Sequence, residues 1–580
     1  MEPPRPRCRL PLRVAGLLLA TAGGVAVALA AVANAAGNAA RANVTAPAAP
    51  APAGATPPAA DPAASAALAA ARAHREAHGA EILREYAAFL ALPNLASDVA
   101  GIRANADWIA AALARRGVVS EVLGLPGRPE APPVVYGELS AQQGSPGARR
   151  TLLVYAHYDG QPVEAARWRQ PPWQPTLATR AFEAGGAPRP LPAPGEPIDP
   201  EWRLYARSAA DDKAPIAALL AALDALAAAG VPRTVDLKLF FEGEEEAGSP
   251  HLGDYLAAYG DRLAGDAGDV WLFFDGPVHQ SGRPQLFFGV RGVAGLEITV
   301  YGAERYLHSG HYGNFAPNPA LELARLLASM KDADGRVTIA GFYDSAAPLG
   351  AAERRALAAV PPFEDELRRD LGLAASEGGD ARYGERMALP SLNVRGFVSG
   401  SVGETARNVI PPEATASLDL RLVKGDDPEA MLELVAAHVR RQGWHVVSEP
   451  PDHATRLAHP RIARLAPQPH YRAVRTAIDL PIVAPVAAAA EAAAGEPVVL
   501  TPTLGGSLPL YLFEDLSSLP LIGVPIVNHD NNQHGANENL RLKNLRDGIG
   551  IYAALMARLG HHWDQGPGAG SSDPESPGSP

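Results

Sequence analysis

Three short apolar runs, each bounded by turn residues, constrain the fold of this chain most strongly. They span residues 151–156, 235–241 and 270–274, and a helical pattern at 214–229 separates the first two runs. Apolar runs of this length suit strands that are buried on both faces of a parallel sheet. Strands that alternate with helices require crossover connections. The sequence therefore predicts an α/β fold with a mostly parallel central sheet flanked by helices.

The pattern changes after about residue 292. Residues 296–301 and 416–422 alternate apolar and polar side chains, as half-exposed strands do, and helical patterns lie nearby at 318–331 and 428–442. With 580 residues, the chain is long enough for two or more domains. We expect a main α/β domain in two parts, 67–292 and 451–563, and a smaller inserted α+β domain at 293–450.

The N-terminal segment is typical of an export signal. Arginines in the first 13 residues precede an apolar run at 14–32, and Ala33-Asn34-Ala35 fits a small-x-small cleavage site. We expect residues 1–35 to be a signal peptide, or a membrane anchor if uncleaved, and the mature protein to be periplasmic or secreted. The Ala/Pro-rich residues 36–66 are expected to form a linker, and residues 564–580 a disordered tail.

Charge and cysteine content exclude several classes of function. The formal net charge is −12, which argues against nucleic acids and acidic membrane surfaces as partners, because both favour a basic surface. The single cysteine, Cys8, precedes the region expected to fold. The chain therefore has no internal disulfide and no multi-thiolate metal site, and any metal ion would need His, Asp and Glu ligands.

Five clusters of His, Asp and Glu follow expected strands or lie beside expected helices. They are His157 with Asp159, Asp211 with Asp212, the glutamates at 242, 244, 245 and 246, Asp275, and His529 with His534. Each cluster alone has an ordinary structural interpretation, such as a core histidine, a helix cap or a solvated charge run. Ligands of open α/β sheets gather at the carboxyl edge of the strands. The set together therefore indicates a site for metal-assisted hydrolysis.

In their order along the chain, these clusters resemble the two-metal exopeptidase and aminoacylase family. That family includes carnosinase, peptidase V, carboxypeptidase G, aminoacylase and succinyl-diaminopimelate desuccinylase. The resemblance extends from about residue 66 to 559 and is carried by VYAHYDG, RSAADDKAP, FFEGEEEAGS, WLFFDGP and NHDNNQHGANENL. The stretches HYDGQPVE, PPWQPT and GFYDSAAP are most similar to the dipeptidase and carnosinase branch.

The resemblance implies a ligand set for two divalent cations. Asp211 would bridge them, His157 and Asp275 would complete one site, and Glu246 and His534 would complete the other. Zinc suits such a set, and cobalt or manganese are alternatives.

The resemblance also implies catalytic roles. Glu245 would be the general base, Asp159 would orient His157, and the Asp211-Asp212 peptide bond would be cis. His308, in YLHSGHYGN, would stabilise the oxyanion from the partner subunit of a homodimer. The inserted domain would then be both lid and dimer interface.

Substrate binding would involve the lid and the C-terminal part of the main domain. Arg421 would grip the terminal carboxylate of the substrate, since guanidinium pairs with carboxylate in a bidentate way. The other implied substrate-binding residues are Asn408, Gly505, Gly506 and Ser507. Two positions depart from the family pattern, which usually has glycine where this chain has Ala214 and Asn314.

The sequence predicts a metal-dependent exopeptidase for dipeptides or short peptides. The same chemistry would serve an N-acyl amino acid deacylase or desuccinylase, and the sequence does not separate the two. A binding protein that has lost catalysis should lack a ligand or the base, yet every implied position is filled. A glycosidase that uses two carboxylates would not account for the histidines in register with the acids.

Overall fold

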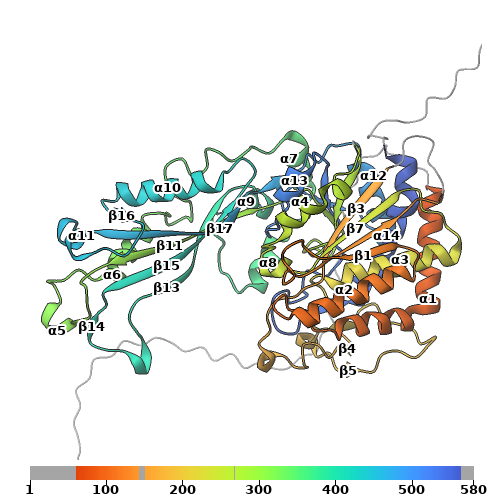
Figure 1. The fold of residues 1–580 in the computed structure, drawn as a ribbon, viewed down its shortest axis with the longest axis horizontal. Coiled ribbons are helices and arrows are strands. Elements are labelled where there is room, and N and C mark those ends of the chain that lie inside the picture. Colours follow the sequence, from red (N-terminus) through yellow and green to blue (C-terminus); the bar gives the residue numbers. More distant parts are fainter. Residues whose placement is uncertain (1–60, 143–149, 267, 380, 564–580) are drawn as a thin grey trace, which may run out of the picture. The chain divides into compact units, whose positions relative to one another are not determined.

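The computed structural model describes residues 61–142, 150–266, 268–379 and 381–563 (Figure 1). The expected signal peptide, most of the expected linker and the expected tail lie outside these residues. Within them, no helix combines the length and the apolar character needed to cross a membrane. The first helix starts at Pro62, earlier than expected, because the Asp61 side chain caps it by accepting the N–H of Ala63 at 2.9 Å.

An eight-stranded mixed sheet forms the centre of the main domain, in the order β1-β2-β7-β3-β8-β20-β9-β19. Strands β7, β3, β8 and β20 run parallel to one another, while β1, β2 and β9 introduce antiparallel pairs. The predicted α/β fold with a mostly parallel central sheet is therefore confirmed. The strands are β1 (Val119–Leu123), β2 (Val134–Leu139), β3 (Thr151–His157), β7 (Asp236–Glu242), β8 (Val270–Phe273), β9 (Gln285–Phe287), β19 (Val499–Thr501) and β20 (Leu521–Gly523).

Helices cover both faces of this sheet, because successive side chains of a strand point to opposite faces. In β3, Leu152, Val154 and Ala156 join the core beneath α1, α3 and α14, whereas Leu153 and Tyr155 join the core beneath α4 and α13. The helices are α1 (Pro62–Leu90), α2 (Val99–Ala114), α3 (Lys213–Ala229), α4 (Leu252–Leu263), α12 (Val483–Ala494), α13 (Tyr511–Leu516) and α14 (Leu542–His562).

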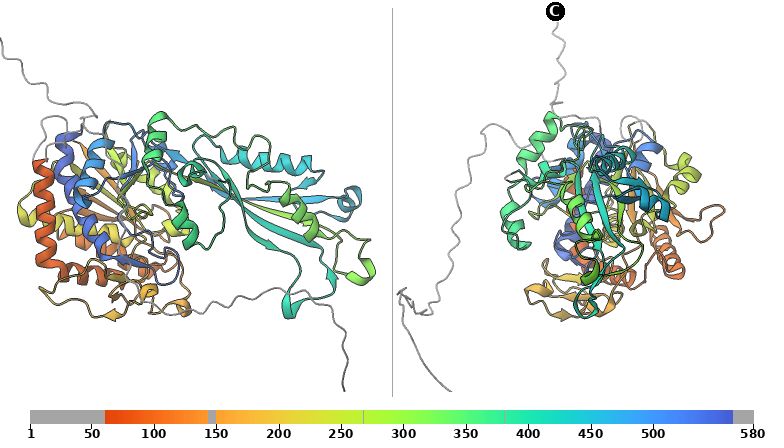
Figure 2. Two further views of the ribbon diagram at one scale, coloured as in Figure 1. Left: turned by 180° about the vertical axis from the view of Figure 1, so that it is seen from behind. Right: turned by 90° about the vertical axis from the view of Figure 1, so that its left-hand side faces the viewer.

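A second sheet of five strands, in the order β13-β15-β11-β17-β16, forms the inserted α+β domain. Two helices, α6 and α10, pack on one face of it around a separate core (Figure 2). The strand β17 lies beyond the expected boundary at residue 450 and pairs with β11 from Ile462 onward. The elements are β11 (Gly292–Tyr301), α6 (Pro319–Ala328), β13 (Ser391–Val398), β15 (Glu413–Leu422), α10 (Pro428–Arg441), β16 (His445–Val447) and β17 (Ile462–Tyr471).

The remaining elements are short. A four-stranded sheet, in the order β21-β6-β4-β5, joins two loops that are far apart in the sequence. Its strands are β4 (Thr176–Ala178), β5 (Pro188–Arg189), β6 (Arg203–Tyr205) and β21 (Asn539–Arg541). The others are β10 (Gly289–Val290), β12 (Leu307–His308), α5 (Ser309–Tyr312), α7 (Ala351–Ala359), α8 (Glu364–Asp370), α9 (Tyr383–Met387), β14 (Val409–Ile410), α11 (His453–Ala458) and β18 (Val474–Arg475).

Candidate active site

Three neighbouring parallel strands deliver acidic and histidine side chains to one edge of the central sheet. His157 is the last residue of β3, Glu245 and Glu246 lie in the short 3₁₀ turn after β7, and Asp275 follows β8 by two residues. The order β7-β3-β8 places these strand ends side by side. Asp211 enters the same edge from the loop that precedes α3.

The ligand atoms of the five predicted metal ligands lie close together in two groups. Those of His157, Asp211 and Asp275 are within 4.8 Å of one another, and so are those of Asp211, Glu246 and His534. Asp211 belongs to both groups: its Oδ1 is 3.0 Å from His157 Nε2, and its Oδ2 is 3.1 Å from His534 Nε2. The two groups therefore share one carboxylate.

Asp159 connects the β3 edge to the turn after β7. Its two carboxylate oxygens accept the backbone N–H groups of Glu245 and Glu246, each at 3.0 Å, and one oxygen lies 3.3 Å from His157 Nδ1. Glu245 Oε2 is 3.9 Å from His157 Nε2, on the side of that ring that faces Asp211. The peptide bond between Asp211 and Asp212 is cis.

The carboxylates of the cluster have pKa values shifted away from the ordinary values for Asp and Glu. Burial, together with neighbouring acids, raises the pKa of Glu245, Glu246 and Asp275 above the ordinary values for these side chains. Burial would also raise the pKa of Asp211, but hydrogen bonds with His157 and His534 hold it below its ordinary value. Cations at this edge would relieve the mutual repulsion of the other carboxylates.

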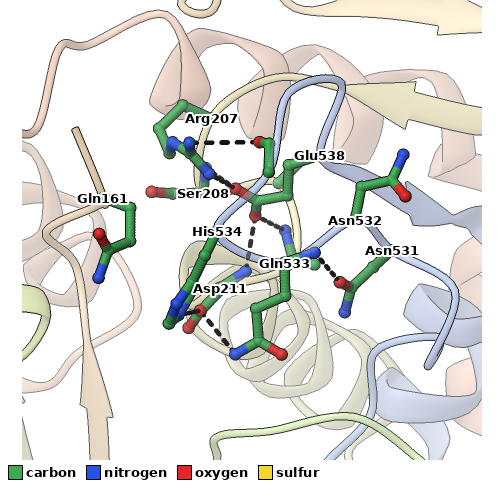
Figure 3. A network of polar contacts seen from close by, with 12 residues as sticks. Gln161, Arg207, Ser208, Asp211, Asn531, Asn532, Gln533, His534 and Glu538 are labelled. Atoms are coloured by element: carbon green, nitrogen blue, oxygen red, sulfur yellow. Dashed lines mark hydrogen bonds and ion pairs between the residues drawn. The ribbon is translucent and has the colours of Figure 1, made fainter. Parts of the chain in front are cut away.

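Glu538, which the sequence analysis did not identify, organises the loop that carries Asp211 (Figure 3). Its carboxylate is fully buried and accepts the backbone N–H groups of Ser208, Ala210 and Asp211 at 2.8–3.0 Å. It also pairs with the Arg207 guanidinium at 2.7 Å. A glutamate in a polar loop looks like a surface residue in sequence, so only its position in NHDNNQHGANENL, close to His534, could have pointed to it.

Two glutamines were also missed. Gln161 Nε2 donates to Glu246 Oε2, and Gln533 Nε2 donates to Asp211 Oδ2, both at 2.7 Å. Both side chains line the cavity next to the carboxylate cluster. No clear spacing signal marks them, because amides are common in loops.

A cavity of about 680 Å³ opens over the cluster and extends to the inserted domain. Arg421 lines it and donates to Ser507 Oγ at 2.7 Å and to Asp419 Oδ2 at 3.0 Å. Gly505, Gly506 and Ser507 line it as well. The structure therefore brings four of the predicted substrate-binding residues to the same cavity as the metal cluster.

His308 and Asn408 are placed differently. Both are exposed, and neither is among the described residues that line the cavity. They lie beside each other on the inserted domain, where Ser309 N–H donates to the Asn408 carbonyl at 3.0 Å and Gly310 N–H donates to His308 Nδ1 at 3.1 Å. Within this chain, the structure does not bring them to the cluster.

Comparisons with known proteins give the same family as the motifs. Peptidase family M20/M25/M40 matches residues 153–558. A Cys-Gly metallodipeptidase of Schizosaccharomyces pombe is 25% identical over 435 residues, which cover 74% of this chain and 83% of that protein. The beta-Ala-His dipeptidase of Homo sapiens is 25% identical over 443 residues, which cover 74% of this chain and 78% of that protein.

The fold is shared with solved structures. An M20 family metallo-carboxypeptidase of Sulfolobus solfataricus superposes with a TM-score of 0.65 at 26% identity, covering 82% of this chain and 98% of that one. The family match spans more than half of the chain and includes all five predicted metal ligands. These matches confirm the resemblance in the motifs: the chain belongs to peptidase family M20/M25/M40 and is thus a hydrolase.

Proposed function

We propose that the protein is a metal-dependent exopeptidase that hydrolyses dipeptides or short peptides with a free carboxylate. The observation that carries this proposal is the Asp211 carboxylate shared by two ligand groups, with Glu245 beside them. A single structural ion pair would not need a second group of ligands on the same carboxylate. The two groups together would provide ligands for two cations.

The residues present fit two divalent cations. The donors are imidazole nitrogens and carboxylate oxygens, which suit zinc, and cobalt or manganese could substitute. The half-buried acids Glu245 and Glu246 lie close to the buried Asp275. Glu245 lies 3.9 Å from His157 Nε2, and Glu246 lies 3.3 Å from His534 Nε2. His157 and Asp275 would hold one cation, Glu246 and His534 the other, and Asp211 both.

The residues of the chain perform the proton transfers. Bound cations would polarise the scissile carbonyl and make a water molecule more acidic. Glu245, held in place through its backbone by Asp159, is the residue that would accept a proton from the attacking water and deliver it to the leaving amine.

Arg421 and the turn at Gly505–Gly506–Ser507 support the substrate class. The guanidinium lines the same cavity as the acids and provides a partner for a terminal carboxylate. The relatives named above act on Cys-Gly and on beta-Ala-His, and both are dipeptides. Peptide hydrolysis is therefore preferred over the alternative of N-acyl amino acid deacylation.

The test compares wild type with Glu245→Gln, after zinc reconstitution, on a panel of dipeptides and N-acyl amino acids. We expect kcat to fall by at least about 100-fold in the variant, with about two metal ions retained per chain. Glu130→Gln, at an exposed glutamate away from the cluster, is the matched control. A Glu245→Gln variant as active as wild type would overturn the assignment of the base, and faster cleavage of N-acyl amino acids would favour the deacylase.

We infer further that His308 acts from a partner subunit of a homodimer. Its exposure on the inserted domain, away from the cavity of its own chain, supports this inference. Mixing the inactive His308→Ala and Glu245→Gln proteins should then restore part of the activity through mixed dimers. Activity that stays absent after mixing and subunit exchange would contradict it.

Export remains a proposal that rests on residues 1–35. The Arg-rich start and the apolar run support a periplasmic or secreted mature protein. Cell fractionation and N-terminal sequencing of the mature chain would test it. Recovery of the full-length chain in the cytoplasm would contradict it.

A further inference from the structure

One side of the cavity is apolar, and the chemistry described so far does not use it. We call it the apolar wall. It consists of Leu357, Val360, Phe363, Tyr383, Met387 and Leu504. Five of these six residues come from α7, α9 and the segment between them, and they are mostly half-buried. A wall of partly exposed apolar side chains gains free energy when an apolar ligand covers it.

The apolar wall begins beside the metal cluster. Asp275 is followed by Val278 and His279, which also line the cavity. The His279 ring meets the Phe363 ring edge-on at 5.0 Å, and Phe363 in turn contacts the Tyr383 ring at 5.5 Å. The wall is therefore continuous with the part of the cavity where the scissile bond would lie.

The other end of the wall reaches the turn beside Arg421. A Cβ atom on Gly505 would lie 3.4 Å from the Tyr383 hydroxyl and 3.5 Å from Met387 Sδ. Arg291, itself buried, approaches both Met387 Sδ at 3.8 Å and the Arg421 carbonyl at 3.3 Å. The wall thus spans the interval between the metal cluster and the proposed carboxylate site.

The wall is attached to the main domain, and the two acids nearest to it, Glu353 and Glu364, are both paired with arginines. Glu353 of α7 pairs with Arg475 at 2.9 Å, and both side chains are about nine-tenths buried. Glu364 and Arg382 at its border pair with each other at 2.9 Å. Because these charges neutralise each other, they offer nothing specific to a charged ligand, and the wall is held in place before substrate binds.

We propose that the apolar wall is a subsite for a large aliphatic or aromatic side chain on the substrate residue that carries the free carboxylate. That residue lies between the scissile bond and Arg421, which is the same interval that the wall spans. The inference rests on the proposed function, because Arg421 as the carboxylate partner sets the direction of the substrate. The preferred substrates are therefore dipeptides with C-terminal leucine, phenylalanine or a similar residue.

The test measures kcat/KM for alanyl-leucine, alanyl-phenylalanine, alanyl-glycine and leucyl-glycine with the zinc-loaded protein. We expect the first two to be cleaved about 10- to 100-fold more efficiently than alanyl-glycine. Leucyl-glycine should not share this gain, because its apolar side chain is on the other residue. Equal values for alanyl-leucine and alanyl-glycine, with hydrolysis intact, would overturn the subsite and leave the proposed function standing.

Substitutions in the apolar wall test whether it causes the preference for alanyl-leucine. Val360→Asp and, as a milder change, Met387→Ala should lower kcat/KM for alanyl-leucine by about 10-fold and change that for alanyl-glycine little. Leu371→Ala, at a residue 61% exposed in the same segment and outside the cavity, is the matched control. An equal loss for both substrates in Met387→Ala would show a merely structural role and contradict the subsite.

A binding measurement separates this inference from the proposed function. Calorimetry with zinc-loaded Glu245→Gln should give a lower Kd for alanyl-leucine than for alanyl-glycine. A preference for leucine in binding without cleavage of any peptide by wild type would keep the subsite and remove the peptidase assignment. Equal Kd values would remove the subsite.

Discussion

At the scale of single residues, the contacts of His279 beside the cavity favour its neutral form. His279 is 8% exposed, and its Nδ1 accepts the N–H of Ser281 at 3.1 Å. Burial, with the nearby positive charge of Arg283 as a further cause, lowers the pKa of His279 to about 4. The folded protein therefore holds this ring neutral, with the proton on Nε2.

A pH dependence of stability follows from His279. Because its folded pKa lies below the unfolded value of about 6.5, the unfolded chain binds the extra proton first as the pH falls. The stabilisation is fully present above pH 6.5 and is lost as the pH falls towards 4. Between pH 7 and pH 5, wild type should lose about 2 kcal/mol relative to His279→Asn. Urea unfolding of both proteins checks this, and a difference that does not change with pH would contradict it.

Asn314 stands where the family pattern implied by the motifs has a glycine, and its backbone conformation is one that glycine favours. Its φ is 64°, a left-handed conformation that glycine adopts freely and asparagine tolerates better than most residues. The usual glycine and this asparagine therefore suit the same turn. Ala214, the other departure, is fully buried in α3, where its methyl group joins the core.

At the scale of elements, the site depends on two loops that are joined by a buried ion pair. The loop before α3 carries Asp211, and the loop before β21 carries His534. Arg207 and Glu538 pair at 2.7 Å between them, with side chains 2% and 0% exposed. Arg207 also reaches the Gly535 carbonyl at 3.3 Å. The pair thus sets the distance between two metal ligands that are more than 300 residues apart.

Glu538→Gln should therefore weaken metal binding. The amide has one acceptor oxygen in place of two, so part of the donor set around Arg207 and Asp211 loses its partner. We expect the metal dissociation constant to rise by about 10- to 100-fold, as measured by competition with a chromogenic chelator. Asp530→Asn is the matched control, because this acid of the same loop pairs with Arg203 instead. Unchanged metal affinity in Glu538→Gln would show that the ion pair between Arg207 and Glu538 does not position the metal ligands.

At the scale of the whole molecule, the cluster joins the two sequence segments of the main domain. His157 to Asp275 come from the part before the inserted domain, and His534 and Glu538 come from the part after it. The long helix α14, from the second part, packs against α1 and α3 from the first. A ligand that binds the cluster would thus stabilise the association of both parts.

Removal of metal should lower the stability of the whole protein. A ligand present at 100 times its Kd stabilises the folded state by about 2.7 kcal/mol, and the buried carboxylates would repel one another without it. We expect a chelator to lower Tm in scanning calorimetry and added zinc to restore it. Asp211→Asn, which alters the shared ligand, should respond much less. An identical Tm with chelator and with zinc in wild type would argue against a metal site.

Local patterns were enough for the main features of the fold. The strands β3, β7 and β8 are largely apolar, and a run of this kind has few places in a globular protein other than a sheet buried on both faces. The sequence therefore determined the α/β class, the inserted α+β domain and the acidic and histidine side chains at the strand ends. The ordered motifs also determined the family, because each one carries several polar residues at fixed spacing.

The tertiary structure alone decided the burial of Glu538, the pairing of β17 with β11 and the apolar wall. Glu538 is buried because Arg207 and a backbone loop, more than 300 residues away in the chain, supply its hydrogen-bond donors. The wall is made of half-buried side chains from short helices, and Phe363 lies in it through contacts with His279 and Tyr383 that no periodicity reports. Sequence patterns record how each residue relates to its near neighbours, whereas burial and pairing depend on partners that only folding brings into contact.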